Sequence, residues 1–176
     1  MTLGLIPHEY EPVIDLDGYP LAYFITFRCY GTWLHGDPRG SIDPQHNQRG
    51  EPLLPENPGI HRRRWSQLRN PPMTLLAPHR SVVDRTVRGV CRHRGWELHA
   101  LNVCGDHVHV VVGARCRPEL VMTSFKSWST RRLREAGLVA EDGRVWSRHG
   151  STRYLWTQKE ITDASLYTLE AQGQKT

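Results

Sequence analysis

The stretch WELHALNVCGDHVHVVVGA, residues 96–114, decides the fold of this 176-residue chain. Two runs rich in β-branched and apolar residues are divided by the turn residues 104–106, a pattern that predicts a hairpin. In the second run His107 and His109 flank Val108, so both imidazoles project from one face of the strand, about 6 to 7 Å apart at their bases. The valines project from the other face. One face of the hairpin can therefore be buried in a core, and the other can carry functional side chains.

Ahead of the hairpin, the sequence predicts a strand and then a long insertion. The run 21–34 is rich in aromatic and β-branched residues, which is typical of a strand. Residues 36–80 are polar and interrupted by many prolines, and only 61–68 has the pattern of a short helix. We expect this segment to be an irregular insertion within a domain and not a domain of its own.

One helix is predicted before the hairpin and one after it. Ser81 with Asp84 resembles a capping box, and apolar residues then recur at helical spacing until Gly95 supplies a C-cap. A second helix begins around Pro118, a residue that suits the first turn, and ends at Gly137. Both helices have one apolar face, so we expect both to pack on a sheet.

The chain closes with a strand and a third helix. A short strand is predicted near 152–156, and Thr157 with Glu160 forms a capping box for a helix that runs to about Gly173. The first six elements follow the β-α-β-β-α-β order of a ferredoxin-like fold, an α+β architecture with one antiparallel sheet and its helices on one face. We expect one domain over 1–176, with the last helix appended to it.

The composition favours a nucleic-acid partner. The formal net charge is +5 with a pI near 9.3, and three dense arginine groups, at 61–65, 91–96 and 129–134, each have a tryptophan within or close to them. Guanidinium groups bind phosphates and stack on rings, so this combination suits phosphate and base recognition. The alternative interpretation is that these arginines form ordinary solvated surfaces.

The cysteines and the hydropathy pattern exclude other classes of protein. The four cysteines form no CxxC pair, which argues against a zinc ribbon and a disulfide framework, so we expect reduced thiols. No apolar run is long enough to cross a bilayer, and the first residues lack the basic and apolar regions of a signal peptide. We therefore expect a soluble cytoplasmic protein without a membrane partner.

Tyr167 differs from the other five tyrosines in its setting. It shares a polar stripe of the last predicted helix with Glu160, Asp163 and Glu170. The drier face of that helix is formed by Ile161, Ala164, Thr168 and Ala171. A tyrosine on a polar stripe does not serve the core, so Tyr167 is either an exposed surface residue or a reactive one.

The phrase HisValHis within GDHVHVVV, followed by a helix reading SLYTLEAQGQ, resembles the single-tyrosine HUH transposases, particularly the REP-associated tyrosine transposases similar to the IS200/IS605 family. The phrases SFKSWSTRRLR and GSTRYLW also look like segments of that group, so the resemblance covers roughly residues 20–173. It implies that His107 and His109 are metal ligands and that Tyr167 is the nucleophile.

The family completes its metal site with a Gln, Glu or similar residue near the tyrosine, commonly a Gln one helical turn on. Here Ala171 occupies that position. Glu170 lies on the tyrosine stripe, whereas Gln172 lies some 140° round an ideal helix. Geometry favours Glu170 and the family pattern favours Gln172, so both are kept as candidate ligands. Two imidazoles and one oxygen suit Mn²⁺ well and Mg²⁺ less well.

The resemblance implies a bacterial, nucleoid-associated enzyme that cleaves and rejoins single-stranded DNA at hairpin or REP-like ends. The reaction would be transesterification through a 5'-phosphotyrosine intermediate. Backbone contacts are expected from the basic residues of the predicted helix at 118–137, with a tryptophan as a stacking platform. The candidates are Lys126, Arg131, Arg132 and Arg134, with Trp128 or Trp65 as the platform.

Two other functions compete with this one. The first is a non-catalytic ferredoxin-like protein that binds single-stranded nucleic acid, although no RRM-type aromatic run is visible. The second is a metal-dependent phosphodiesterase in which His107 and His109 hold an ion that activates water, and Tyr167 is incidental. The sequence leaves open the DNA target, a mobile or domesticated role, a monomer or homodimer, and a role of 36–80 in reading DNA or covering the site.

Overall fold

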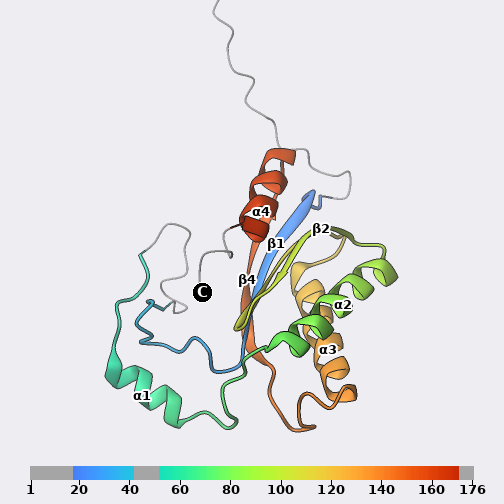
Figure 1. Cartoon of the computed structure of the whole chain (residues 1–176). Helices are drawn as coiled ribbons and strands as arrows, with labels where there is room; N and C mark the ends of the chain where they lie inside the picture. Colours follow the sequence, from blue (N-terminus) through green and yellow to red (C-terminus); the bar gives the residue numbers. More distant parts are fainter. Residues whose placement is uncertain (1–17, 42–51, 171–176) are drawn as a thin grey trace, which may run out of the picture.

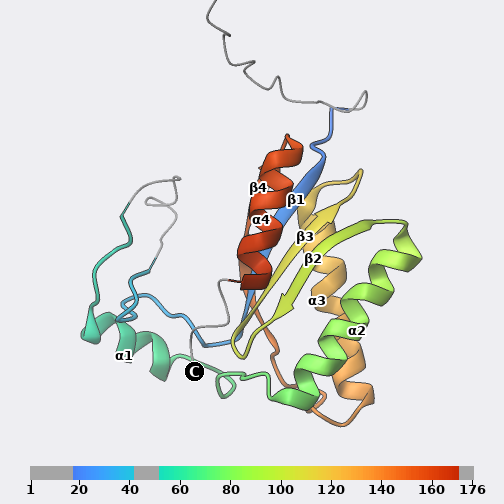
Figure 2. The same cartoon turned by 45° about the horizontal axis from the view of Figure 1, so that its top comes forward.

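The computed structural model describes residues 18–41 and 52–170 (Figure 1). Within them the strands form one antiparallel sheet in the order β2-β3-β1-β4 (Figure 2). The strands are β1 (Ala22–Cys29), β2 (Glu97–Val103), β3 (His107–Gly113) and β4 (Trp146–Leu155). The helices are α1 (Pro58–Ser66), α2 (Ala77–Arg94), α3 (Pro118–Glu135) and α4 (Gln158–Glu170). Apart from α1, this is the predicted order, and the predicted ferredoxin-like α+β class is confirmed.

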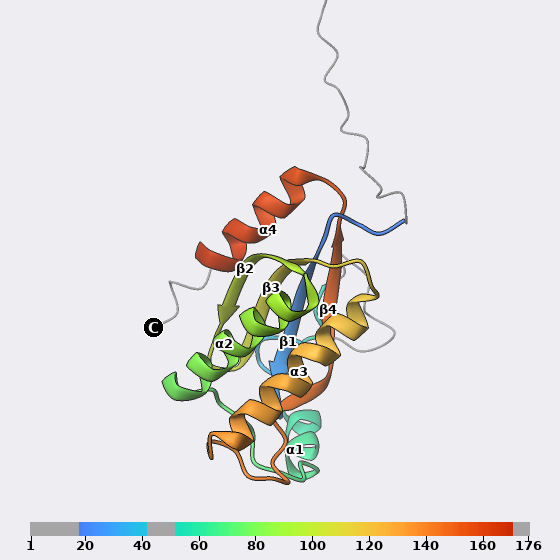
Figure 3. The same cartoon turned by 90° about the vertical axis from the view of Figure 1, so that its right-hand side faces the viewer.

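Helices cover both faces of the sheet. The pair α2 and α3 packs on one face, and α4 packs across β2 and β3 on the other (Figures 2 and 3). The main core lies on the α2–α3 face and includes Val108, Val110 and Val112 of β3. A smaller core on the α4 face joins Val111 to Ile161 and other apolar residues. The α4 face of β3 is also the face of His107 and His109, because side chains alternate along a strand.

The predicted hairpin is confirmed. β2 and β3 pair in antiparallel register and the chain turns at 104–106, where the Cys104 amide donates to the His107 carbonyl at 2.9 Å. The valines of β3 that face α2 and α3 are completely buried. The alternation of valine and histidine thus divides β3 between a core face and a second face, as the sequence predicts.

The predicted start of α2 is wrong. The helix begins at Ala77, with Pro78 in its first turn and no side-chain cap. Ser81 and Asp84 lie inside the helix, where the Asp84 carboxylate accepts from Arg88 at 2.9 Å and caps nothing. Proline needs no amide partner in a first turn, so the helix can start before the apparent capping box.

The lengths of β1 and β4 also differ from the prediction. β1 ends at Cys29 and not at 34, and the chain turns at Gly31, whose φ of 73° lies in the left-handed region. β4 begins at Trp146 and not at 152. Its first half is polar because β4 is an edge strand, and a Cβ at Gly150 would lie 2.5 Å from the Thr26 carbonyl oxygen. This close approach explains a glycine in a paired strand.

α4 begins as predicted. The Glu160 amide donates to Thr157 Oγ1, and the Thr157 amide donates back to Glu160 Oε2, both at 3.2 Å. Ile161, Ala164 and Thr168 are buried against the sheet, which confirms three of the four residues of the predicted dry face; the fourth, Ala171, lies outside the described residues. Residues 171–173, where the helix was expected to end, lie outside the described residues.

The described parts of the insertion carry one helix, α1, which stands apart from the sheet (Figure 1). It starts at Pro58, three residues before the predicted start, because Asn57 Oδ1 accepts from the Ile60 amide at 3.0 Å and caps it. None of its residues is buried. Among the helices of 18–41 and 52–170, none has both the length and the apolar character needed to cross a membrane.

Candidate active site

The fold brings Tyr167 onto the histidine pair. The rings of His107 and His109 have centroids 4.6 Å apart on the α4 face of β3. Tyr167 projects from α4, and its ring centroid lies 5.8 Å from that of His109. About half of Tyr167 is exposed (51%), whereas His109 is buried (7%). Three residues predicted to act together therefore lie together, with the phenol open to solvent.

His109 is held by the neighbouring strand. Thr26 of β1 lies opposite it in register, and Thr26 Oγ1 is 2.7 Å from His109 Nδ1. Burial, aided by the nearby charge of His107, lowers the pKa of His109 to about 4. Its imidazole is therefore neutral at neutral pH, the form in which a histidine binds a metal.

His107 is held by an acidic neighbour. Its Nδ1 lies 2.5 Å from Asp106 Oδ1. Burial opposes the charged imidazole, but hydrogen bonds with Asp106 and Cys104 outweigh that effect and raise the pKa of His107 to about 9. The hydrogen bond from His107 likewise lowers the pKa of Asp106 to about 2. The pair is thus an imidazolium and a carboxylate at neutral pH.

The donor atoms fit a metal site in part. Because Nδ1 of each imidazole already has a partner, Nε2 is the atom that each ring would offer to a metal. Within 18–41 and 52–170, no three His, Cys, Asp or Glu side chains form a group that could hold an ion. Glu170 is the last described residue and is exposed, and Gln172 lies outside the described residues. The third ligand therefore stays a prediction.

Three residues that sequence reasoning missed position Tyr167 and its neighbours. Phe24 of β1 packs its ring against Tyr167 at 5.9 Å and against His109 at 5.4 Å between centroids. Asn102 of β2 donates to the carbonyl of Thr168, the residue after Tyr167, at 2.9 Å. The third is Thr26. Alternation along 22–28 could have placed Phe24 and Thr26 on one face, but not beside the histidines.

A second missed group lies at the His107 end of the site. Arg28 of β1 pairs with His107 in register, and its guanidinium carbon lies 3.4 Å from the Trp33 ring centroid. Arg39 bonds Asp37 at 2.8 Å and reaches Asp106 Oδ2 at 3.3 Å. The start of the predicted insertion therefore reaches the candidate active site.

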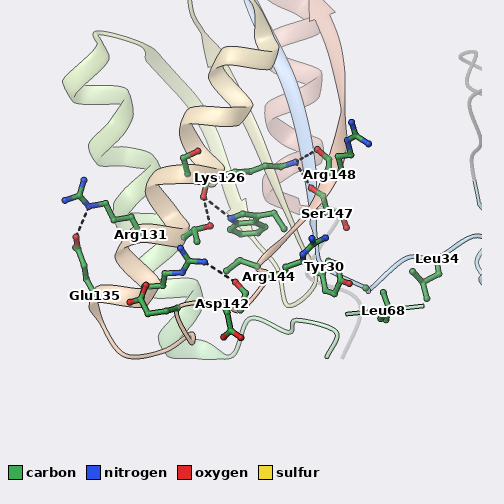
Figure 4. A pocket seen from close by; sticks show the side chains of 18 residues that line it. Tyr30, Leu34, Leu68, Lys126, Arg131, Glu135, Asp142, Arg144, Ser147 and Arg148 are labelled. Atoms are coloured by element: carbon green, nitrogen blue, oxygen red, sulfur yellow. Dashed lines mark hydrogen bonds and ion pairs between the residues drawn. The ribbon is translucent and has the colours of Figure 1, made fainter. Parts of the chain in front are cut away.

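The predicted DNA-binding residues lie elsewhere, on α3 and so on the opposite side of the sheet from α4. Lys126, Arg131 and Arg134 line a hollow of about 960 Å³ beside the start of β4 (Figure 4). Lys126 Nζ donates to the Ser147 carbonyl at 2.9 Å, and burial lowers the pKa of Lys126 to about 8. Arg131 pairs with Glu135 at 2.9 Å.

Two of the remaining DNA-binding candidates lie on the other side of α3, and the third, Trp65, lies on α1. Arg132 and Trp128 line a hollow of about 660 Å³ between α2 and α3, with the guanidinium carbon 5.8 Å from the indole centroid. Trp65 is half-exposed on α1. The structure thus gathers the catalytic candidates at one site and divides the basic candidates between two hollows on the far face.

The histidine pair and the helix-borne tyrosine lie together on an antiparallel sheet, which is the arrangement that the resemblance drawn from the sequence implies. Residues 73–159, which contain both histidines, match the family described as "Transposase IS200 like", so this segment of the chain is similar to the IS200-like transposases. The resemblance drawn from the sequence is thereby confirmed. The match ends before Tyr167.

A solved structure of similar fold supports the architecture. A crystal structure of a candidate transposase from Deinococcus radiodurans R1 superposes with a TM-score of 0.50 and 15% identity, covering 85% of this chain and 88% of that one. The structure of a REP-associated tyrosine transposase bound to a REP hairpin gives a TM-score of 0.49 and 13% identity, covering 91% of this chain and 69% of that one. No curated protein matches the chain.

Proposed function

We propose that this transposase is a metal-dependent enzyme that cleaves and rejoins single-stranded DNA through a covalent bond to Tyr167. The observation that supports the proposal is the position of the Tyr167 ring, 5.8 Å from His109 and beside a histidine pair whose Nδ1 atoms are both engaged. The match to the IS200-like transposases supports the DNA substrate, and a bacterial, nucleoid-associated setting is part of the same proposal.

His107 and His109 would hold a divalent ion, with Glu170 or Gln172 as the third ligand. Mn²⁺ suits such a nitrogen and oxygen set better than Mg²⁺, which prefers oxygen ligands. The ion, when bound, would act as a Lewis acid on the scissile phosphate. Thr26 and Asp106 would fix the two imidazole planes, since each accepts or shares a hydrogen bond at Nδ1.

The proposed reaction exchanges one phosphodiester for another. The Tyr167 hydroxyl loses its proton as its oxygen bonds to phosphorus, and the bond from phosphorus to the 3' oxygen breaks. The leaving oxygen keeps the electron pair and takes up a proton, which gives a free 3'-hydroxyl and a 5'-phosphotyrosyl enzyme. Because the new bond is also a phosphodiester, another 3'-hydroxyl can reverse the step and join new ends without ATP.

The substrate we propose is a single strand with a hairpin or palindromic repeat. A hairpin presents phosphates in two directions, and the basic hollows on either side of α3 would contact its backbone away from the cleavage point. Tyr167 already meets the histidines of its own chain, so a homodimer is not needed to assemble the site. A dimer would serve to hold two DNA ends.

The test is adduct formation with a hairpin-bearing DNA strand and Mn²⁺, measured by denaturing electrophoresis and mass spectrometry. We expect a covalent protein–DNA adduct that disappears in Tyr167→Phe. Tyr154→Phe is the matched control, because Tyr154 is about as exposed as Tyr167 but lies on β4, packed against Tyr23.

Other outcomes favour the competing functions. An adduct that survives Tyr167→Phe would assign the nucleophile to another residue. Cleavage with a free 5'-phosphate and no adduct would favour a phosphodiesterase that activates water. Binding without cleavage under all metal conditions would favour a non-catalytic nucleic-acid-binding protein.

A further inference from the structure

We propose that Arg28 is a further catalytic residue, whose guanidinium binds a non-bridging oxygen of the phosphate that Tyr167 attacks. This inference rests on the proposed function. Its first support is position. Phe24, Thr26 and Arg28 are every second residue of β1, so all three lie on the α4 face. There Phe24 contacts Tyr167 and Thr26 contacts His109. Arg28 continues this row to the position opposite His107.

The second support is the orientation of the guanidinium. Its carbon lies 3.4 Å from the centroid of the Trp33 ring, which is stacking distance. A guanidinium that stacks on a ring keeps its N–H groups in the plane and pointed outward, where they can bind a phosphate. Trp33 is itself held by a hydrogen bond from its Nε1 to the Gly40 carbonyl. The arginine is thus supported from one side by a fixed surface.

The third support is the state of the neighbouring carboxylates. Asp37 bonds Arg39, and Asp106 is shared between His107 and Arg39. Within 18–41 and 52–170, these two carboxylates therefore make their ion pairs with residues other than Arg28. A partly buried cation without such an ion pair is stabilised most when an anionic ligand, such as a phosphate, binds to it.

The electrostatics agree with this position. Burial and the nearby charge of Arg39 lower the pKa of Arg28, whereas Asp106 and Tyr167 act in the opposite direction. Negative charge on the phosphate oxygens must be stabilised while the bond from Tyr167 forms and the bond to the 3' oxygen breaks. Arg28 would do this without exchanging a proton, as fixed donors do in other phosphoryl and acyl transfers.

The test compares Arg28→Gln, Arg28→Lys and the control Arg88→Gln, a half-exposed arginine of α2 that pairs with Asp84. Single-turnover adduct formation is measured with saturating hairpin DNA and Mn²⁺. We expect the rate to fall about 100-fold or more in Arg28→Gln, as for loss of one fixed transition-state donor. Arg28→Lys should recover part of that rate, and Arg88→Gln should keep the full rate.

A second measurement does not depend on cleavage. In the Tyr167→Phe background, the slope of log affinity for single-stranded DNA against log salt should become shallower by about 0.7 in Arg28→Gln, for one lost phosphate contact. Arg28→Lys should keep the slope. A purely structural role of Arg28 would lower the melting temperature but leave this slope unchanged.

The outcomes separate the two proposals. If the wild type forms an adduct and Arg28→Gln keeps both the rate and the slope, the role of Arg28 is wrong and the proposed function stands. If the wild type binds DNA without forming an adduct, the proposed function is wrong and the slope still tests Arg28. A wild type that binds no DNA would overturn both proposals.

If Arg28→Gln does not fold, the Arg28→Lys variant tests the inference in its place. A reduced rate of adduct formation with an unchanged salt slope supports the inference, and an unchanged rate contradicts it.

Discussion

At the scale of single residues, the chemistry of the site depends on what holds each imidazole. His109 is buried, neutral and bonded to Thr26, whereas His107 is bonded to Asp106 and kept protonated by it. The two rings lie 4.6 Å apart and yet prefer different protonation states. Binding of a metal at both rings would require His107 to lose its proton, so the partners at Nδ1 set the affinity of the site.

Thr26→Val tests this dependence on the partner residues. The substitution keeps the side-chain shape but removes the oxygen that lies 2.7 Å from His109 Nδ1. We expect the dissociation constant for Mn²⁺, measured by titration calorimetry, to rise about 10- to 100-fold. Thr86→Val on α2 is the control, because its hydroxyl bonds only the Val82 carbonyl. Equal affinity in the wild type and Thr26→Val would show that His109 is oriented without this contact.

At the scale of elements, α4 is fixed at both ends while its reactive residue stays exposed. The reciprocal bonds of Thr157 and Glu160 close its first turn, and Asn102 binds the Thr168 carbonyl near its last turn. Ile161 and Ala164 provide the apolar contact between these points. Tyr167 is thus placed by contacts before and after it in the helix, together with the packing of its ring against Phe24.

Asn102→Ala should loosen the end of α4 without unfolding the protein. The Thr168 carbonyl would lose a partner, which is worth about 1 kcal/mol. We expect faster amide hydrogen exchange in 164–170, a melting temperature close to that of the wild type, and slower adduct formation. Asn57→Ala, which removes the cap of α1, is the control and should leave exchange in α4 unchanged. Unchanged exchange in Asn102→Ala would mean that the small core alone holds the helix.

At the scale of the whole molecule, the sheet separates the candidate chemistry from most of the candidate DNA contacts. Tyr167 belongs to α4, and the histidines lie on the face of the sheet that α4 covers. The basic candidates lie on α3, on the opposite face. A DNA strand that reaches both must pass round an edge of the sheet. Arg28 lies at the end of β1, and Tyr30, which lines the hollow beside the start of β4, follows two residues later. This end of the sheet is therefore the short route between the two faces.

Replacing Arg131, Arg132 and Arg134 together by Gln should weaken DNA binding. Loss of three phosphate contacts should make the salt slope for single-stranded DNA shallower by about 2, as measured by fluorescence anisotropy. The control replaces Arg62, Arg63 and Arg64 of α1 by Gln, which changes the net charge equally. If both triple variants lose affinity alike, the effect comes from net charge and not from α3.

The sequence by itself determined the parts of this protein that depend on local geometry. Side chains two apart on a strand share a face, so His107, Val108 and His109 could be assigned to their faces from the sequence. Helical spacing likewise separated Tyr167 from the buried Ile161. The element order followed from the same patterns, whereas the likeness to the IS200-like transposases came from the phrase HisValHis and its context and is matched by residues 73–159. The start of α2 was missed because proline and a capping box compete as local signals there.

Only the tertiary structure decided which residues from distant parts of the chain share the site. Thr26 and His109 are 83 positions apart, and their contact depends on the register between β1 and β3, which no local pattern specifies. The same register sets Arg28 opposite His107. The packing of α4 on the face away from α3 likewise depends on which surfaces remain to be buried after the sheet forms. Periodicity therefore determined which side chains lie on each face of an element, and long-range packing determined which residues of other elements they contact.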